Sequence, residues 1–223
     1  MRGGRAPVAL VVVWTILLLV GLASPALAVT VELRGGAAPV NAEKVDFERG
    51  GLRVTLAGVQ TTVIAWDQVR SVTGRPLSDA ERSMLAVAED LWRARSRVQR
   101  GDLSLATGLL ERHFADFRGT TSETALIVAE GLLRCRLTRD PMQAIVPAIE
   151  VARLRRAKVT TDRYLALPVV LDETTLLCPA LAPTWPKDAT SEAVAVELDA
   201  MLGGATAMFD PETRRVGEIY VAL

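Results

Sequence analysis

The hydrophobic pattern of this 223-residue chain changes its period once, and the change divides the chain into two parts. From residue 29 to about 72, apolar and polar residues alternate, as in Val29-Thr30-Val31-Glu32-Leu33. A period of two is typical of strands with one buried face. From Ser78 onward, apolar residues recur every three or four positions, which is typical of amphipathic helices. The sequence therefore predicts an α+β fold in which a β part precedes an α part.

The β part, residues 29–74, is predicted to hold four or five short strands. After the first strand, alternating runs cover residues 45–48, 52–56 and 62–66, with a short fifth at 69–72. Glycines stand between the runs, and they accept the positive φ that tight hairpins require. We therefore expect a small antiparallel meander. About 45 residues are near the lower limit for a domain that folds alone, so we expect it to lean on the helices.

The Trp66-Asp67-x-Val69 corner of this region resembles the strand ends of SH3-like and Sm-like barrels. The resemblance implies that the meander curls into a small barrel.

Residues 78–158 carry the pattern of four helices in two antiparallel hairpins. Ser78-x-x-Glu81 is a capping box for the first helix, and Gly101-Asp102 separates it from the second. Thr120-x-x-Glu123 predicts the start of the third helix. Asp140-Pro141 predicts the start of the fourth, in which Pro147 predicts a kink.

The joint at 101–106 resembles the turn and second-helix start of a tetratricopeptide (TPR) repeat. Its Asp102-x-x-x-Ala106 pattern returns as Asp140-x-x-x-Ala144. The resemblance covers roughly residues 88–157, and it implies a short concave groove that binds a peptide.

Residues 159–223 change character. Leu167–Leu171 is predicted to be extended, and the prolines within 178–186 leave little room for a helix. A short helix is predicted at 191–202. At the end, Val216, Ile219 and Tyr220 stand at helical spacing. This apolar face either packs back onto the protein or pairs with another chain.

The first 28 residues predict export. Arg2 and Arg5 precede an uncharged run from 8 to 22, and Ala26-Leu27-Ala28 has the small-x-small pattern of a cleavage site. We expect a signal peptide that is cleaved after Ala28. The alternative is an uncleaved signal anchor, which would attach the protein to the membrane.

The composition limits the partners and the chemistry. With 26 basic and 26 acidic residues, the chain has no overall field for nucleic acid, so we exclude that partner. The single histidine, His113, cannot supply a multi-histidine metal site, and no common catalytic motif is present. His113 is predicted to be solvated on its helix. We therefore predict no catalytic residue, no metal and no cofactor.

The only two cysteines are Cys135 and Cys178. In an exported protein they can form a disulfide. The alternative is two buried free thiols, since cysteine packs as a small apolar residue.

Arginine is the most distinctive polar feature. Two groups are candidates for a patch that binds an anionic partner: Arg93, Arg97 and Arg100 on the first helix, and Arg153, Arg155 and Arg156 at the end of the fourth. The alternative is an ordinary solvated helix face, because acids at helical spacing pair with some of these arginines.

These observations favour an exported, non-enzymatic interaction or scaffold protein of the cell envelope, which binds another protein through its helical surface. Two alternatives stay open. One is an enzyme that uses carboxylates or arginines on an anionic substrate, and the other is an accessory subunit of an envelope complex.

Overall fold

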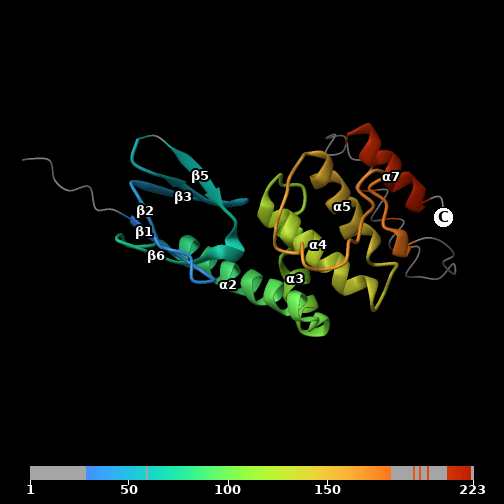
Figure 1. Ribbon diagram of the computed structural model, residues 1–223, viewed down its shortest axis with the longest axis horizontal. Helices are drawn as coiled ribbons and strands as arrows, with labels where there is room; N and C mark the ends of the chain where they lie inside the picture. Colours follow the sequence, from blue (N-terminus) through green and yellow to red (C-terminus); the bar gives the residue numbers. More distant parts are fainter. Residues whose placement is uncertain are drawn as a thin grey trace, which may run out of the picture.

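The computed structural model describes residues 29–58, 60–181 and 210–221, with residues 193, 196 and 200 between the last two ranges. Figure 1 shows the β part at one end of the molecule and the helices at the other. The predicted order, strands first and helices after, is therefore confirmed. The predicted signal peptide at 1–28, its cleavage point, and most of the predicted helix at 191–202 lie outside the described residues.

The described strands form two separate antiparallel sheets of three strands each. One sheet has the order β2-β1-β6 and the other the order β3-β4-β5. The strands are β1 (Val29–Leu33), β2 (Val40–Ala42), β3 (Lys44–Glu48), β4 (Gly51–Thr55), β5 (Thr61–Ile64) and β6 (Val69–Thr73). The expectation of one meander curled into a barrel was wrong for this part of the chain, where the sheets do not close. Alternation predicts which face of a strand is buried, but it does not predict which strands pair.

Two elements of the β part were missed. β2 is only three residues long and directly follows Pro39, so its sequence carries almost no alternation. Trp66 opens a short 3-10 helix, η2 (Trp66–Gln68), instead of ending a strand. The turn at η2 sends the chain from β5 in one sheet to β6 in the other.

The first two helices agree closely with the prediction. They are α2 (Asp79–Arg100) and α3 (Leu103–Phe117). At the start of α2, the Ser78 hydroxyl accepts a hydrogen bond from the Glu81 amide, and the Glu81 carboxylate accepts one from the Ser78 amide. The predicted capping box is therefore present. Gly101 ends the helix with a φ of 81°, a conformation that favours glycine.

The third and fourth helices, α4 (Glu123–Leu137) and α5 (Ile145–Arg156), both start later than predicted. Ser122 caps α4 by accepting from the Ala125 amide, whereas the Thr120 hydroxyl donates to the Phe117 carbonyl. Pro147 lies in the first turn of α5, where amides have no partner within a helix. Proline costs no hydrogen bond there, so it marks the start of the helix and not an internal kink.

α4 is the centre of the helical part. Every residue from Thr124 to Cys135 is buried, because α2, α3 and α5 all pack against this helix. Gly131 is essential to this packing, since a Cβ atom there would lie 2.7 Å from the Tyr164 hydroxyl and 3.2 Å from a Leu110 methyl. Residues 161–177, which we call the strap, contain no helix or strand and bring Tyr164 to this position.

The last described helix, α7 (Pro211–Val221), packs against α5. Val216 and Tyr220 are buried there, and the Tyr220 hydroxyl accepts a hydrogen bond from the Cys178 amide at 2.7 Å. Cys178 directly precedes a short 3-10 helix, η3 (Pro179–Leu181). Of the two possibilities for the apolar end, its described residues pack back onto the protein, and Ile219 stays 45% exposed.

The β part and the helices meet around Trp66, which is fully buried. Its amide donates to the Thr124 hydroxyl at 3.1 Å, and its indole N–H donates to the Glu48 carbonyl at 3.1 Å. The two parts approach so closely that a Cβ atom on Gly50 would lie 2.8 Å from the Cβ of Ser122. The β part is therefore fastened directly to the start of α4.

Candidate functional site

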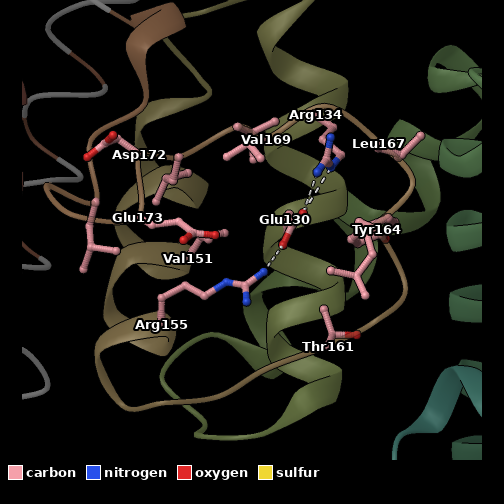
Figure 2. A pocket seen from close by; sticks show the side chains of 14 residues that line it. Glu130, Arg134, Val151, Arg155, Thr161, Tyr164, Leu167, Val169, Asp172 and Glu173 are labelled. Carbon is pink, nitrogen blue, oxygen red and sulfur yellow. Dashed lines mark hydrogen bonds and ion pairs between the residues drawn. The ribbon is translucent and has the colours of Figure 1, made fainter.

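A cavity of about 320 Å³ lies between α4, α5 and the strap. Figure 2 shows charged side chains from the two helices, together with side chains of the strap, around this pocket. We call it the strap pocket. It is bounded by Glu130 and Arg134 of α4, Val151 and Arg155 of α5, and strap residues from Thr161 to Leu176.

Glu130 is the centre of the polar part of this pocket. It is buried, and its two carboxylate oxygens bind two different arginines, as the dashed lines in Figure 2 show. Oε1 accepts from Arg134 Nη2 at 2.7 Å, and Oε2 accepts from Arg155 Nη2 at 3.0 Å. A buried carboxylate needs such partners to offset its loss of hydration.

Arg134 also holds the strap in place. Its Nη1 donates to the Pro168 carbonyl at 2.8 Å, and its guanidinium lies 5.3 Å from the centre of the Tyr164 ring. The Tyr164 hydroxyl in turn donates to the Ile127 carbonyl of α4 at 3.1 Å. Burial raises the pKa of Tyr164 well above its usual value, so this side chain stays neutral.

Arg155 differs from Arg134 in its exposure. The Arg134 side chain is 9% exposed and uses all three of its nitrogens, whereas the Arg155 side chain is 35% exposed. Among the described residues, Glu130 is the only acceptor that Arg155 contacts. Arg155 therefore keeps N–H groups that are available to a ligand.

The strap forms the rim of the pocket. Leu165 and Val169 are 79% and 76% exposed, the highest values among the exposed large apolar side chains of the described residues. Asp172 is also on the rim, but its Oδ1 accepts hydrogen bonds from the amides of Thr174 and Thr175. The bonds from Thr175 lower the pKa of Asp172, so this carboxylate is ionised and bound within its own turn.

The arrangement is suited to binding more than to proton transfer. Both oxygens of Glu130 are held by arginines, and Asp172 stabilises a turn. A general acid or base needs a free carboxyl whose pKa is close to the working pH. Neither side chain is free to act in this way.

The six arginines of the predicted patch have different partners in the structure. On α2, Arg93 pairs with Glu89 at 2.7 Å, Arg97 donates to the Leu105 carbonyl, and Arg100 lies 3.6 Å from Asp102. On α5, Arg155 turns into the strap pocket, while Arg156 pairs with Asp210 at 2.9 Å.

Arg153, the sixth, is buried. It donates to both oxygens of Glu150 and to the Thr120 carbonyl, and Glu150 also accepts from the Gly119 amide at 2.8 Å. This network ties α5 to the turn between α3 and α4. Arg153 is therefore a structural residue, and Arg155 is the member of the predicted group that lines the strap pocket.

A second buried carboxylate, Asp67, was not predicted as a site. It belongs to η2, has no exposed surface, and faces Arg95 of α2 and Arg163 of the strap. Arg95 Nε is 3.1 Å away and Arg163 Nε 3.4 Å away, but neither contact has hydrogen-bond geometry. Burial outweighs the two arginines and raises the pKa of Asp67 to about 6.

Cys135 and Cys178 are buried free thiols in this structure, so the disulfide considered above is not formed here. Burial raises the pKa of both thiols, which makes them poor nucleophiles. His113 is buried and not solvated as expected, and its Nε2 lies 3.1 Å from Asp90 Oδ2. The amphipathic pattern placed His113 on a helix but did not show that Asp90 of α2 would cover it.

No group of three or more His, Cys, Asp or Glu side chains suited to a metal ion occurs in the described part of the chain. In the same residues, no helix has the length and apolar character needed to cross a bilayer.

No family model, curated protein or solved structure matches the chain.

Sequence reasoning missed most of the strap pocket. One signal was present: Glu130 is a single acid within the apolar run from Leu126 to Leu133, and a buried charge in such a run requires partners. The strap gave no comparable signal, because its contacts with α4 join residues more than 30 positions apart.

Proposed function

We propose that this chain is an exported, non-enzymatic binding protein of the cell envelope, and that it holds a partner protein at the strap pocket. The observation that carries the proposal is the rim of that pocket. Leu165 and Val169 expose more than three quarters of their surface beside a cavity that contains the available N–H groups of Arg155. Exposed apolar side chains around a concave site are typical of interaction surfaces.

The TPR-like nature of the two helical hairpins stays a prediction. The proposed face does not depend on it, because the strap and α5 form this face together with α4.

A photo-cross-linking experiment in cells tests the proposal. A benzoylphenylalanine at position 169 should give a defined adduct with one envelope protein. Position 105 is the matched control, since Leu105 is also apolar and 60% exposed but lies on α3, outside the pocket. Adducts of the same kind from both positions, or none from position 169, would show that the strap is not a binding face.

An enzyme acting on an anionic substrate is the second candidate. It is favoured by one observation, the meeting of Glu130, Arg155 and Glu173 at one cavity. Recovery of the bound molecule after incubation separates the two candidates. A binding protein returns it chemically unchanged, whereas an enzyme returns a product.

A further inference from the structure

The charges of the strap pocket are arranged in two layers. Inside, the single carboxylate of Glu130 lies between the guanidinium groups of Arg134 and Arg155, which leaves this layer with one net positive charge. Outside, Asp172 and Glu173 are exposed on the rim, where water and salt screen their charge. A charged group that passes the rim therefore meets a positive surface.

The free polar groups inside the pocket are donors. Arginine has five N–H groups, and Arg155 uses one of its three nitrogens on Glu130. The carboxylate oxygens of Glu130 are already occupied. The hydroxyls of Thr161 and Tyr164 donate to Glu123 and to the Ile127 carbonyl. Among the described lining residues, an anionic ligand finds unused donors on Arg155, whereas the carboxylate left to a cationic ligand, that of Glu173, is exposed to solvent.

The remaining walls are apolar. Buried Val151 of α5 forms part of one wall, and the strap contributes the other aliphatic side chains, among them Leu167, Val170 and Leu171. Because the Tyr164 hydroxyl donates its hydrogen bond to the Ile127 carbonyl of α4, this residue turns its ring and not its polar end to the cavity. The ligand that fits these walls has an aliphatic body.

The volume limits the size of that body. A cavity of about 320 Å³ corresponds to roughly ten water molecules at ~30 Å³ each. It is near the lower limit for pockets that hold small ligands. A ligand of roughly ten non-hydrogen atoms fills it.

We infer that the strap pocket binds an aliphatic carboxylate, with the carboxylate on Arg155 and the hydrocarbon against Val151 and the strap. This chemistry has two sources, a free aliphatic acid or the last residue of a partner chain. The inference rests on the proposed function only in that it uses the same face of the protein.

Calorimetric titration of the full chain with octanoate, octanol and octylamine tests the ligand class. Octanoate should bind at least tenfold more tightly than octanol, because a charge-assisted hydrogen bond to arginine is lost in the alcohol. Octylamine should bind more weakly still. The inference would be overturned if octanol or octylamine bound as tightly as octanoate. It would also be overturned if neither octanoate nor N-acetyl-leucine bound.

Two neighbouring arginines provide a matched pair of variants. Arg155→Gln should weaken octanoate binding at least tenfold, whereas Arg156→Gln should change it less than twofold, because Arg156 does not line the pocket. Arg155→Lys keeps the positive charge beside Glu130, so this variant is used for the test if Arg155→Gln is too unstable. Lysine lacks the planar fork of arginine, and a threefold to tenfold loss is expected. Unchanged binding in Arg155→Lys and Arg155→Gln would contradict the assigned role of Arg155.

N-acetyl-leucine and its amide distinguish the two sources. Binding of octanoate alone assigns a free acid, and binding of N-acetyl-leucine but not its amide assigns a chain end. Binding of both carboxylates supports the shared chemistry. Cross-linking from position 169 is a separate measurement. If cross-linking fails while octanoate still binds, only the proposal of a protein partner is refuted. If cross-linking succeeds but no carboxylate binds, only the proposed carboxylate ligand is refuted.

Discussion

Glu150 and Asp67 are buried to the same degree but are held differently. Glu150, at the joint between α5 and the α3–α4 turn, accepts hydrogen bonds from the Gly119 amide and from two nitrogens of Arg153. Asp67, at the joint between the β part and the helices, has two arginines nearby, but its carboxylate oxygens accept no hydrogen bond from the described residues.

The comparison teaches that opposite charge nearby does not by itself compensate for burial. A desolvated carboxylate is stabilised in its charged form chiefly by donors that point at its oxygens. Asp67 lacks such donors, and its pKa rises to about 6 despite Arg95 and Arg163. The helical joint is therefore built around a firmly held ion pair, and the joint with the β part around an acid that readily takes up a proton.

The largest expected effect is at the helical joint. Glu150→Ala removes the partner of buried Arg153, and leaving a buried charge unpaired costs about 3–5 kcal/mol of unfolding free energy. Urea denaturation measures this loss. Exposed Glu173→Ala is the control and should change the value by about 0.5 kcal/mol or less. A loss below about 1 kcal/mol in Glu150→Ala would remove the contrast between the two joints.

The joint at Asp67 should respond to pH instead. Its folded pKa, about 6, lies above the ordinary value of 3.8, so the folded state binds the proton more tightly than the unfolded state. Asp67 therefore contributes roughly 2–3 kcal/mol to the free energy of unfolding below about pH 4, and this contribution is lost as the pH rises to about 6.

Urea denaturation between pH 4 and 8 checks this prediction against Asp67→Asn, which cannot titrate. The variant should lack that slope and should be at least as stable as the natural chain above pH 6. An identical slope in both proteins would show that another group is responsible.

Two glycines compare the packing inside the helical part with the packing where the β part meets α4. Gly131→Ala brings a Cβ atom to 2.7 Å from the buried Tyr164 hydroxyl, and overpacking of this kind costs about 1–3 kcal/mol. Gly50→Ala brings a Cβ atom to 2.8 Å from the Cβ of Ser122, which can move only with its own backbone, so its loss should be at least as large. Thermal unfolding of both variants measures the difference, and a clearly smaller loss for Gly50→Ala would show that the contact between the β part and α4 yields more readily than the packing around Gly131.

The smallest effect concerns one hydrogen bond between the β part and α4. Thr124→Val removes the acceptor of the buried Trp66 amide and should cost about 1–2 kcal/mol. Thr62→Val, at an exposed position of β5, is the control. Equal stability of Thr124→Val and the natural chain would mean that the Trp66 amide finds another acceptor.

The candidate site was less predictable than the fold. Arg155 belonged to a predicted surface patch, but the structure turns it towards Glu130, a residue 25 positions earlier. Arg134, the other partner of Glu130, reaches the strap at Pro168, 34 positions later in the sequence. Contacts at such separations leave no periodic trace in the sequence, so residue types alone could not show that these side chains meet.

The sequence by itself determined the order of strands and helices, the Ser78 capping box and the Gly101 helix end, because hydrophobic period and capping act within a few residues. Tertiary structure decided which strands share a sheet, that α5 begins only at Ile145, and how Glu130, Arg134 and Arg155 form a pocket with the strap. Those features depend on packing and burial between segments far apart in the chain, and burial is what makes a charged residue seek its particular partner.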